Sequence, residues 1–285
     1  MSKKLRIGGA SGFWGDSVIA TPQLLNGNDL DFIVYDYLAE ITMSIMARAR
    51  AKDATKGYAV DFVSSVLKLN LRQIADQKVK ILSNAGGVNP EACAEAIREL
   101  IKELKLDLKV SVVLGDDLMT EKNKFSELNT KEMYSNEDFP AEDKIASINA
   151  YLGAFPIAEA LKSGADIVIT GRSVDSAVTL GACIYSFGWN EKEYDKLAAG
   201  SLAGHIIECG TQSTGGNFTD WELVSKDLHQ IGYPIVEVSE DGSFDCTKSK
   251  NSTGMVSFGT VAEQMLYEIG DPQAYICLLY TSDAA

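Results

Sequence analysis

The chain contains 285 residues, of which 46% are apolar and 23% are charged, values typical of a globular protein rather than a disordered one. The 40 acidic residues outnumber the 26 lysines and arginines, and the resulting net charge of -14 would repel a nucleic-acid backbone. The sequence lacks an uncharged apolar stretch of about 18 residues, the length that a membrane span requires.

Five short segments are rich in β-branched and apolar residues, as buried parallel strands are. The stretches between them carry apolar residues at helical spacing. This alternation predicts an α/β fold with a mainly parallel sheet, helices on both faces and right-handed crossovers. The predicted strands are residues 5–9, 31–36, 79–84, 109–114 and 166–170.

The helical spacing also predicts which side chains face the core. Ile41, Ile45 and Met46 share one face of the first long helix, and Leu69 joins the buried face of the second. Pro90 marks the first position of a helix, where a missing N–H costs no hydrogen bond. The predicted helices are residues 38–52, 58–77, 90–104, 149–163 and 174–187.

A smaller α+β portion is predicted to follow the parallel sheet. A helix over 197–209 leads into a glycine-rich exit, and a last helix covers 256–269. Between them, Asp241 and Gly242 supply the tight turn of a β-hairpin.

The alternation of strand and helix patterns stops near residue 190, and this change suggests how the chain divides into domains. We expect an α/β core domain over residues 1–190. Residues 191–276 either continue this domain or start a second one. Residues 277–285 are expected to be a non-native tail on a truncated chain, because they contain no turn or cap that would complete a fold.

Parallel sheets bind ligands beyond the carboxyl ends of their strands, so the residues that follow each strand are candidates. The first strand runs into a glycine-rich loop with Gly9, Ser11 and Asp16, which we predict to bind a ligand. The strict dinucleotide fingerprint is absent, and no acidic residue is cleanly placed for a ribose, so a nicotinamide site is disfavoured. A turn shaped only for packing is the alternative.

The third strand runs into Asn84, Gly86 and Gly87, just before the helix that begins at Pro90. The N–H groups and positive dipole end of a helix N-terminus suit a carboxylate, phosphate or enolate oxygen. Asn89 is expected to cap this helix, which leaves Asn84 without a structural explanation. We therefore predict that Asn84 and the two glycines bind a ligand.

Three predicted catalytic residues follow the fourth and fifth strands. Asp116 is one of two adjacent carboxylates that could act as a base or hold a cation, although solvated loop acids are more common. Arg172 can clamp a carboxylate or phosphate, and Asp175, one helical turn further on, can orient its guanidinium. The alternative for Arg172 and Asp175 is a surface ion pair.

A second polar, glycine-rich segment comes after residue 209. Thr214, Gly215, Gly216 and Asn217 are predicted to bind polar ligand groups through backbone and side chains. A flexible surface loop is the alternative.

The sequence gives no paired spacing of the kind zinc sites use. His205, Glu208 and Cys209 share a helix face, but a packed histidine explains this pattern better than a metal. We therefore predict no metal site and no particular cofactor. The five scattered cysteines indicate free thiols in a reducing cytoplasm.

Four segments, taken together and in order, resemble the acyclic terpene utilisation protein AtuA family. They are residues 8–16, 83–90, 170–177 and 209–217, and the similarity runs from residue 5 to residue 276. The resemblance implies a fold and a role in the breakdown of acyclic terpenes such as citronellol and geraniol through acyl-CoA intermediates. It assigns no catalytic residue. The sequence departs from the family pattern at Cys277, which favours truncation.

We therefore expect a cytoplasmic catabolic enzyme, or an enzyme component, that acts on a carboxylate or an acyl-CoA thioester. The alternatives are a non-catalytic scaffold subunit of an acyl-CoA-processing complex and a nicotinamide-dependent oxidoreductase. The expected partner is a small anionic substrate such as an acyl-CoA, with no nucleic acid and no membrane; a homo-oligomer is compatible with the sequence. Asn84, Asp116 and Arg172 should share one cleft, with Ser11 and Asp16 along its rim.

Overall fold

The centre of the protein is a seven-stranded sheet, seen in a computed structural model that describes residues 4–269 apart from 17, 28, 129 and 133. Its strands are β1 Leu5–Gly9, β2 Phe32–Tyr35, β3 Lys80–Ser83, β4 Val110–Val113, β5 Ile167–Thr170, β6 Pro234–Val238 and β7 Phe244–Lys248. The strand order is β4-β5-β3-β2-β1-β6-β7. The first five strands pair in parallel, while β6 and β7 join the sheet antiparallel, so a mainly parallel sheet is confirmed.

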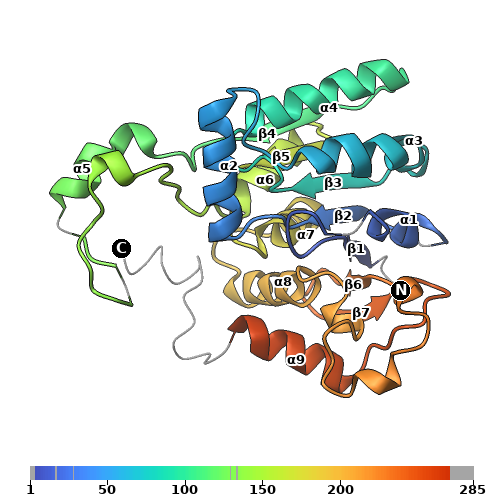
Figure 1. Ribbon diagram of the computed structural model, residues 1–285. Helices are drawn as coiled ribbons and strands as arrows, with labels where there is room; N and C mark the ends of the chain where they lie inside the picture. Colours follow the sequence, from blue (N-terminus) through green and yellow to red (C-terminus); the bar gives the residue numbers. More distant parts are fainter. Residues whose placement is uncertain (1–3, 17, 28, 129, 133, 270–285) are drawn as a thin grey trace.

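Helices cover both faces of the sheet, as predicted (Figure 1). They are α1 Ala20–Leu25, α2 Glu40–Lys52, α3 Lys68–Gln77, α4 Pro90–Leu104, α5 Lys122–Glu127, α6 Phe155–Lys162, α7 Ala177–Phe187, α8 Tyr194–Ile207 and α9 Phe258–Ile269. Side chains of α1 to α4 form one apolar cluster with the sheet, and those of α6 to α8 form another. Within the described residues, none of the helices has the length and apolar character needed to cross a membrane.

Alternating side chains of the central strands explain the two clusters. Ile33 and Tyr35 of β2 pack with α1 to α4, whereas Phe32 and Val34 pack with α6 to α8. All four are buried, which is why the strand reads as a continuous apolar run in the sequence.

The buried face of α2 differs from the prediction. Met43, Met46 and Ala47 are buried, whereas Ile41 and Ile45 are exposed. Figure 1 shows α2 standing across the end of the sheet rather than along one face, so only a narrow stripe of the helix meets the core.

The buried face of α3 was also predicted wrongly at one position. Leu69 is exposed, while Leu71 and Ile74 are buried. A π-helical turn, Phe62–Leu67, comes directly before α3. A π turn contains more residues than an α turn, so the apolar stripe after it is displaced along the sequence.

A long segment between β4 and α6 leaves the sheet and carries α5, which lies to the left in Figure 1. The segment returns through isolated β-bridges that pair Asn149 with Asp117 and Leu152 with Ser173. These extended residues explain why the helix predicted from residue 149 begins only at Phe155.

The predicted hairpin is present, and it extends the same sheet as the parallel strands. Val238 of β6 lies opposite Phe244 of β7, and Ile7 of β1 lies opposite Val236 of β6. The tail predicted at 277–285 lies outside the described residues.

Candidate functional site

The candidate site lies at the edge of the sheet where β1 to β5 end, which we call the carboxyl edge. Asp36 follows β2, Asn84 follows β3, Asp116 lies beyond β4, and Arg172 follows β5. Because parallel strands all end at one edge, their loops meet there. The N-terminal end of α2 also reaches this edge and supplies Glu40.

Arg172 is buried, with 3% of its surface exposed, and three side chains surround its guanidinium. Nη1 donates to Asp175 Oδ1 at 2.7 Å, and Nη2 donates to Glu40 Oε1 at 3.4 Å. The ring of Tyr151 lies 4.1 Å from the guanidinium carbon, a cation–π distance. Burial acts to lower the pKa of Arg172, but Asp175 and the other partners outweigh it, so the guanidinium stays charged.

Tyr151 and Arg172 together fix Glu40. The Tyr151 hydroxyl donates to the same Glu40 oxygen that Arg172 contacts. The hydrogen bond from Tyr151, helped by the nearby guanidinium, lowers the pKa of Glu40. Glu40 is therefore an ionised carboxylate that is still open to solvent.

Asp116 holds the loop that carries Arg172. Its Oδ2 atom accepts hydrogen bonds from the Arg172 backbone N–H and from Asn149 Nδ2, both at 2.8 Å. A side chain at Gly171 would collide with this carboxylate and displace it. Asp116 is itself buried, and burial raises its pKa. These contacts let Asp116 position the loop that carries Arg172, and its predicted catalytic role stays a prediction.

Asn84 binds the buried carboxyl group of Asp36. Its side-chain amide donates to Asp36, while its oxygen accepts from the Tyr37 backbone N–H at 2.7 Å. The Ser11 hydroxyl donates to the Asp36 backbone carbonyl at 3.0 Å. Burial, together with the nearby Asp175, raises the pKa of Asp36 to about 8.

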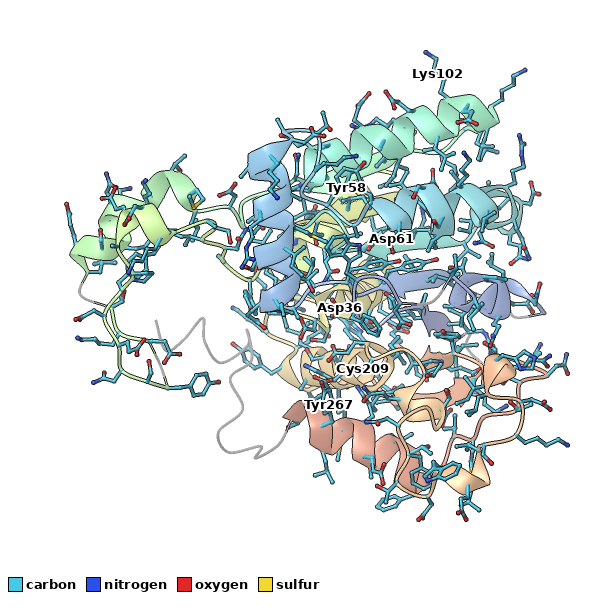
Figure 2. The ribbon with its side chains drawn as sticks, viewed as in Figure 1. Asp36, Tyr58, Asp61, Lys102, Cys209 and Tyr267 are labelled. Atoms are coloured by element: carbon cyan, nitrogen blue, oxygen red, sulfur yellow. The ribbon has the colours of Figure 1, made fainter. Side chains whose placement is uncertain are left out.

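Three carboxyl groups converge behind Arg172, and we call them the carboxyl cluster: Asp36, Asp175 and Glu208. One carboxylate oxygen of each lies within 4.8 Å of the others. Burial raises the pKa of Glu208 well above its usual value. Figure 2 labels Asp36 at the end of β2 and Cys209, the residue after Glu208, just beyond α8.

The first glycine loop is filled by protein atoms. A side chain at Gly9 would collide with the carbonyl oxygen of Ile207, and one at Gly12 would press on the backbone of Cys209. The Asp16 carboxylate accepts from the Gly12 N–H at 3.0 Å and closes the loop on itself. The exit of α8 therefore packs directly against the first glycine loop.

Gly86 and Gly87 are likewise closely packed. A side chain at Gly86 would meet the Thr170 carbonyl oxygen, and one at Gly87 would meet Met46 of α2. Gly87 also has a φ of 55°, which an L side chain rarely adopts. These two glycines let β3, β5 and α2 come together next to Asn84.

The second glycine-rich segment makes a different set of contacts. The Thr214 hydroxyl donates to the Gly232 carbonyl at 2.7 Å, and a side chain at Gly215 would meet Val224. Gly216 and Asn217 are exposed. Among the described residues, the Thr214 hydroxyl links this segment to Gly232 in the loop before β6, and none of the hydrogen bonds of Arg172 involves the segment.

The surface has two hollows, which lie at opposite edges of the sheet. One of about 300 Å³ lies at the carboxyl edge, beside Asn149 and the C-terminal half of α2. Its walls are mostly apolar, with Arg50 and Asp117 in an ion pair of 3.4 Å. Its lining residues are Ala47, Arg50, Ala51, Val88, Asp117, Met119, Ala146, Ser147 and Asn149.

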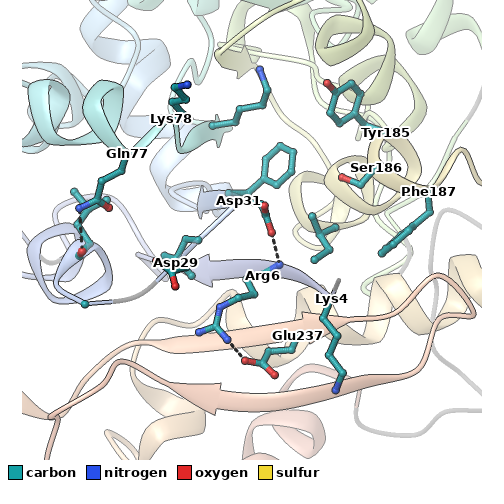
Figure 3. A pocket seen from close by; sticks show the side chains of 16 residues that line it. Lys4, Arg6, Asp29, Asp31, Gln77, Lys78, Tyr185, Ser186, Phe187 and Glu237 are labelled. Carbon is teal, nitrogen blue, oxygen red and sulfur yellow. Dashed lines mark hydrogen bonds and ion pairs between the residues drawn. The ribbon is translucent and has the colours of Figure 1, made fainter. Parts of the chain in front are cut away.

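The larger hollow, of about 1140 Å³, lies at the opposite edge, where β1 to β3 begin (Figure 3). Of the four cations that line it, Lys4, Arg6 and Lys80 are paired with carboxylates, and Lys78 is the fourth. None of the predicted site residues lines it. We place the candidate site at the carboxyl edge, because the buried ionisable groups and the strand ends converge there.

Residues 5–283 match the family model described as acyclic terpene utilisation family protein AtuA. The chain belongs to this family. No curated protein and no solved structure matches the chain. The AtuA family is implicated in the utilisation of acyclic terpenes.

Sequence reasoning did not predict four members of this candidate site: Asp36, Glu40, Tyr151 and Glu208. Asp36 gave a usable signal, because it is the first acid after a buried strand. Glu208 was noted only as a neighbour of Cys209. Glu40 and Tyr151 gave no local signal, since each is brought to Arg172 by a different part of the fold.

Proposed function

We propose that this chain is an enzyme of acyclic terpene breakdown that transfers a proton at the carbon next to a carboxyl or acyl-CoA thioester carbonyl. Glu40 takes that proton, and the carboxyl cluster faces the carbonyl oxygen. Arg172 positions both Glu40 and the carboxyl cluster, because its guanidinium contacts Glu40 and Asp175 at once. This double contact is the observation that carries the proposal.

The two carboxyl groups that the guanidinium contacts, Glu40 and Asp175, differ in exposure and in their neighbours, as the proposed reaction requires. Glu40 is exposed, and its pKa is lowered by Tyr151, so it is ionised at neutral pH and can accept a proton. A carboxylate base with a nearly ordinary pKa is sufficient for such a step when its geometry is fixed. Asp175, which the other guanidinium nitrogen contacts, has 38% of its side chain exposed, and the buried Asp36 and Glu208 each place a carboxylate oxygen within 4.8 Å of it.

The small hollow at the carboxyl edge supports an apolar acyl substrate. Ala47, Val88 and Met119 give it apolar walls that suit a short branched chain. Asn149, in the same wall, binds Asp116, which in turn holds the Arg172 backbone. The Asp116 carboxylate therefore connects the wall of the hollow to the loop that carries Arg172.

The convergence of these side chains supports an enzyme over a scaffold subunit. Asp116 binds the Arg172 backbone, and Asn84 binds Asp36 of the carboxyl cluster. A purely structural subunit has no need to gather so many costly buried ionisable groups at one edge.

Hydrogen–deuterium exchange tests the proposal directly. The full chain is incubated in D₂O with branched unsaturated acyl-CoA thioesters and with the free acids, and the signal of the proton next to the carbonyl is followed by NMR. The enzyme should speed the loss of that signal, and Glu40→Gln should slow the exchange by roughly 100-fold or more. Asp195→Asn, an exposed acid in the first turn of α8, is the matched control and should exchange like the wild type.

The variant Arg172→Lys tests whether Arg172 acts by positioning Glu40 and Asp175 or only through its positive charge. Lysine keeps the positive charge but cannot bind Glu40 and Asp175 with two fixed nitrogens. We expect folded protein with slower exchange. Exchange that is equally fast in Glu40→Gln and the wild type, or absent with every probe, would contradict the proposed function.

A further inference from the structure

Three carboxyl groups from distant parts of the sequence meet at one point in the carboxyl edge. Asp36 follows β2, Asp175 comes just before α7, and Glu208 comes just after α8. One oxygen from each lies within 4.8 Å of the other two. Asp36 and Glu208 are buried and Asp175 is half-buried, so bringing the three together is costly unless positive charge or protons offset their repulsion.

Glu208 adds an independent observation. The residue is 6% exposed, and its Oε2 atom is buried with no hydrogen-bond partner among the described residues. An ionised oxygen there would need a donor or a cation, and a protonated one would need an acceptor. The neighbouring carboxyl of Glu268 can accept from a protonated Glu208, but no ion pair of the described residues gives an ionised Glu208 a cation.

Arg172 does not supply the missing partner of Glu208 Oε2. The two terminal nitrogens of Arg172 donate to Asp175 and to Glu40, and Glu208 is not among its hydrogen-bond partners. The guanidinium is thus already paired with two carboxylates. Asp36 and Glu208 remain without a cation of their own among the ion pairs of the described chain.

We propose that Asp36, Asp175 and Glu208 bind one divalent cation of the Mg²⁺ or Mn²⁺ class. An all-carboxylate set of ligands suits a hard cation that prefers oxygen. The inference deepens the proposed function, because the cation would supply the positive charge that an enolate or carboxylate oxygen of the substrate needs. Glu40 stays outside this ligand set and keeps its part in proton transfer.

A neighbouring trio is the competing location. Glu208 also lies close to Cys209 and Glu268, a mixed sulfur and oxygen set. In that trio Cys209 Sγ already donates to Glu268 Oε1 at 2.8 Å, so both groups have a partner. The all-oxygen cluster therefore fits a hard cation better than this trio does.

The test measures cation binding without any substrate. The full chain is treated with EDTA, dialysed, and titrated with MnCl₂ while the EPR signal of free Mn²⁺ is followed; MgCl₂ is then added as a competitor. We expect one saturable site per chain that Mg²⁺ displaces. Asp36→Asn and Glu208→Gln should each weaken Mn²⁺ binding at least roughly tenfold.

Two further variants decide where the ion binds. Glu268→Gln disables the competing trio and should leave Mn²⁺ affinity unchanged, as should Asp195→Asn on the surface. Glu208→Gln removes one of the repelling charges, so it should fold, and circular dichroism checks this. Absence of saturable binding, or equal affinity in folded wild type and Glu208→Gln, would overturn the inference.

The two proposals fail in distinguishable ways. Mn²⁺ binding without any proton exchange would contradict the proposed function and leave the cation site in place. Exchange that persists in EDTA, with no Mn²⁺ bound, would contradict the cation site and leave the proposed function in place.

Discussion

At the residue scale, the buried ionisable groups of the carboxyl edge are explained by their partners. Arg172 can be buried because Asp175 and Glu40 compensate its charge and Tyr151 covers its face. Asp116 can be buried because two N–H donors bind one of its oxygens. The carboxyl cluster lacks such complete compensation, and this difference separates it from the structural groups around it.

Asp36 gives a prediction about pH. Its folded-state pKa of about 8 lies above the unfolded value of roughly 3.9, so the folded state holds an extra proton between these two pH values. The free energy of unfolding of the metal-free protein should therefore fall as the pH rises from about 4 to about 8, by up to about 1.4 kcal/mol per pH unit from this group.

Urea unfolding in EDTA at several pH values between 5 and 8 measures this dependence. Asp36→Asn keeps an oxygen that can accept from Asn84 but cannot ionise, so its stability should fall less steeply with pH. Some slope should persist, because burial raises the pKa of Glu208 in the same direction. Parallel slopes for the two proteins would contradict the raised pKa of Asp36.

At the element scale, the π-helical turn before α3 decides which leucine supports the core. Leu71 is fully buried, whereas Leu69, two residues earlier in the same helix, is 74% exposed. Leu71→Ala should lower the free energy of unfolding by about 2–5 kcal/mol, because it opens a cavity in the core. Leu69→Ala should change it by less than about 0.5 kcal/mol, since no packing is lost.

This leucine pair is its own control, because both substitutions remove the same atoms from one helix. Urea denaturation of the two variants beside the wild type provides the comparison. A cost for Leu69→Ala as large as that for Leu71→Ala would mean that α3 packs as the plain helical spacing predicted. The same comparison would then place the apolar stripe where Val66 and Leu69 share a face.

At the scale of the whole molecule, the segment after residue 190 completes the parallel sheet. Strand β6 covers the edge of β1 that would otherwise be unpaired, and Ile207 fills the space beside Gly9. Ile206, Ile207, Val236 and Val238 belong to the apolar cluster on the α6–α8 face. Removing this segment would therefore expose apolar surface and a sheet edge together.

We predict that a fragment ending at residue 190 has no cooperative thermal transition, whereas the full chain has one. Far-UV and near-UV circular dichroism during heating would show the difference. A sharp transition of the fragment, with a native near-UV spectrum, would instead make residues 1–190 an independent domain.

The sequence by itself determined the strands and the long helices, but not the short helices α1 and α5, and it determined one contact of the site. Buried strands and amphipathic helices are encoded by patterns a few residues long, so their positions could be read closely; β5, for example, differs from its predicted range by one residue. The Arg172–Asp175 ion pair was equally accessible, because it joins residues one helical turn apart.

Only the tertiary structure decided which distant groups share the site. Asp36, Asp175 and Glu208 meet because β2 and β5 flank β3 and because α8 returns over the end of β1. Glu40 reaches Arg172 because α2 stands across the carboxyl edge. Strand order and helix packing follow from the summed burial of many side chains across the chain, and no short sequence pattern carries that information.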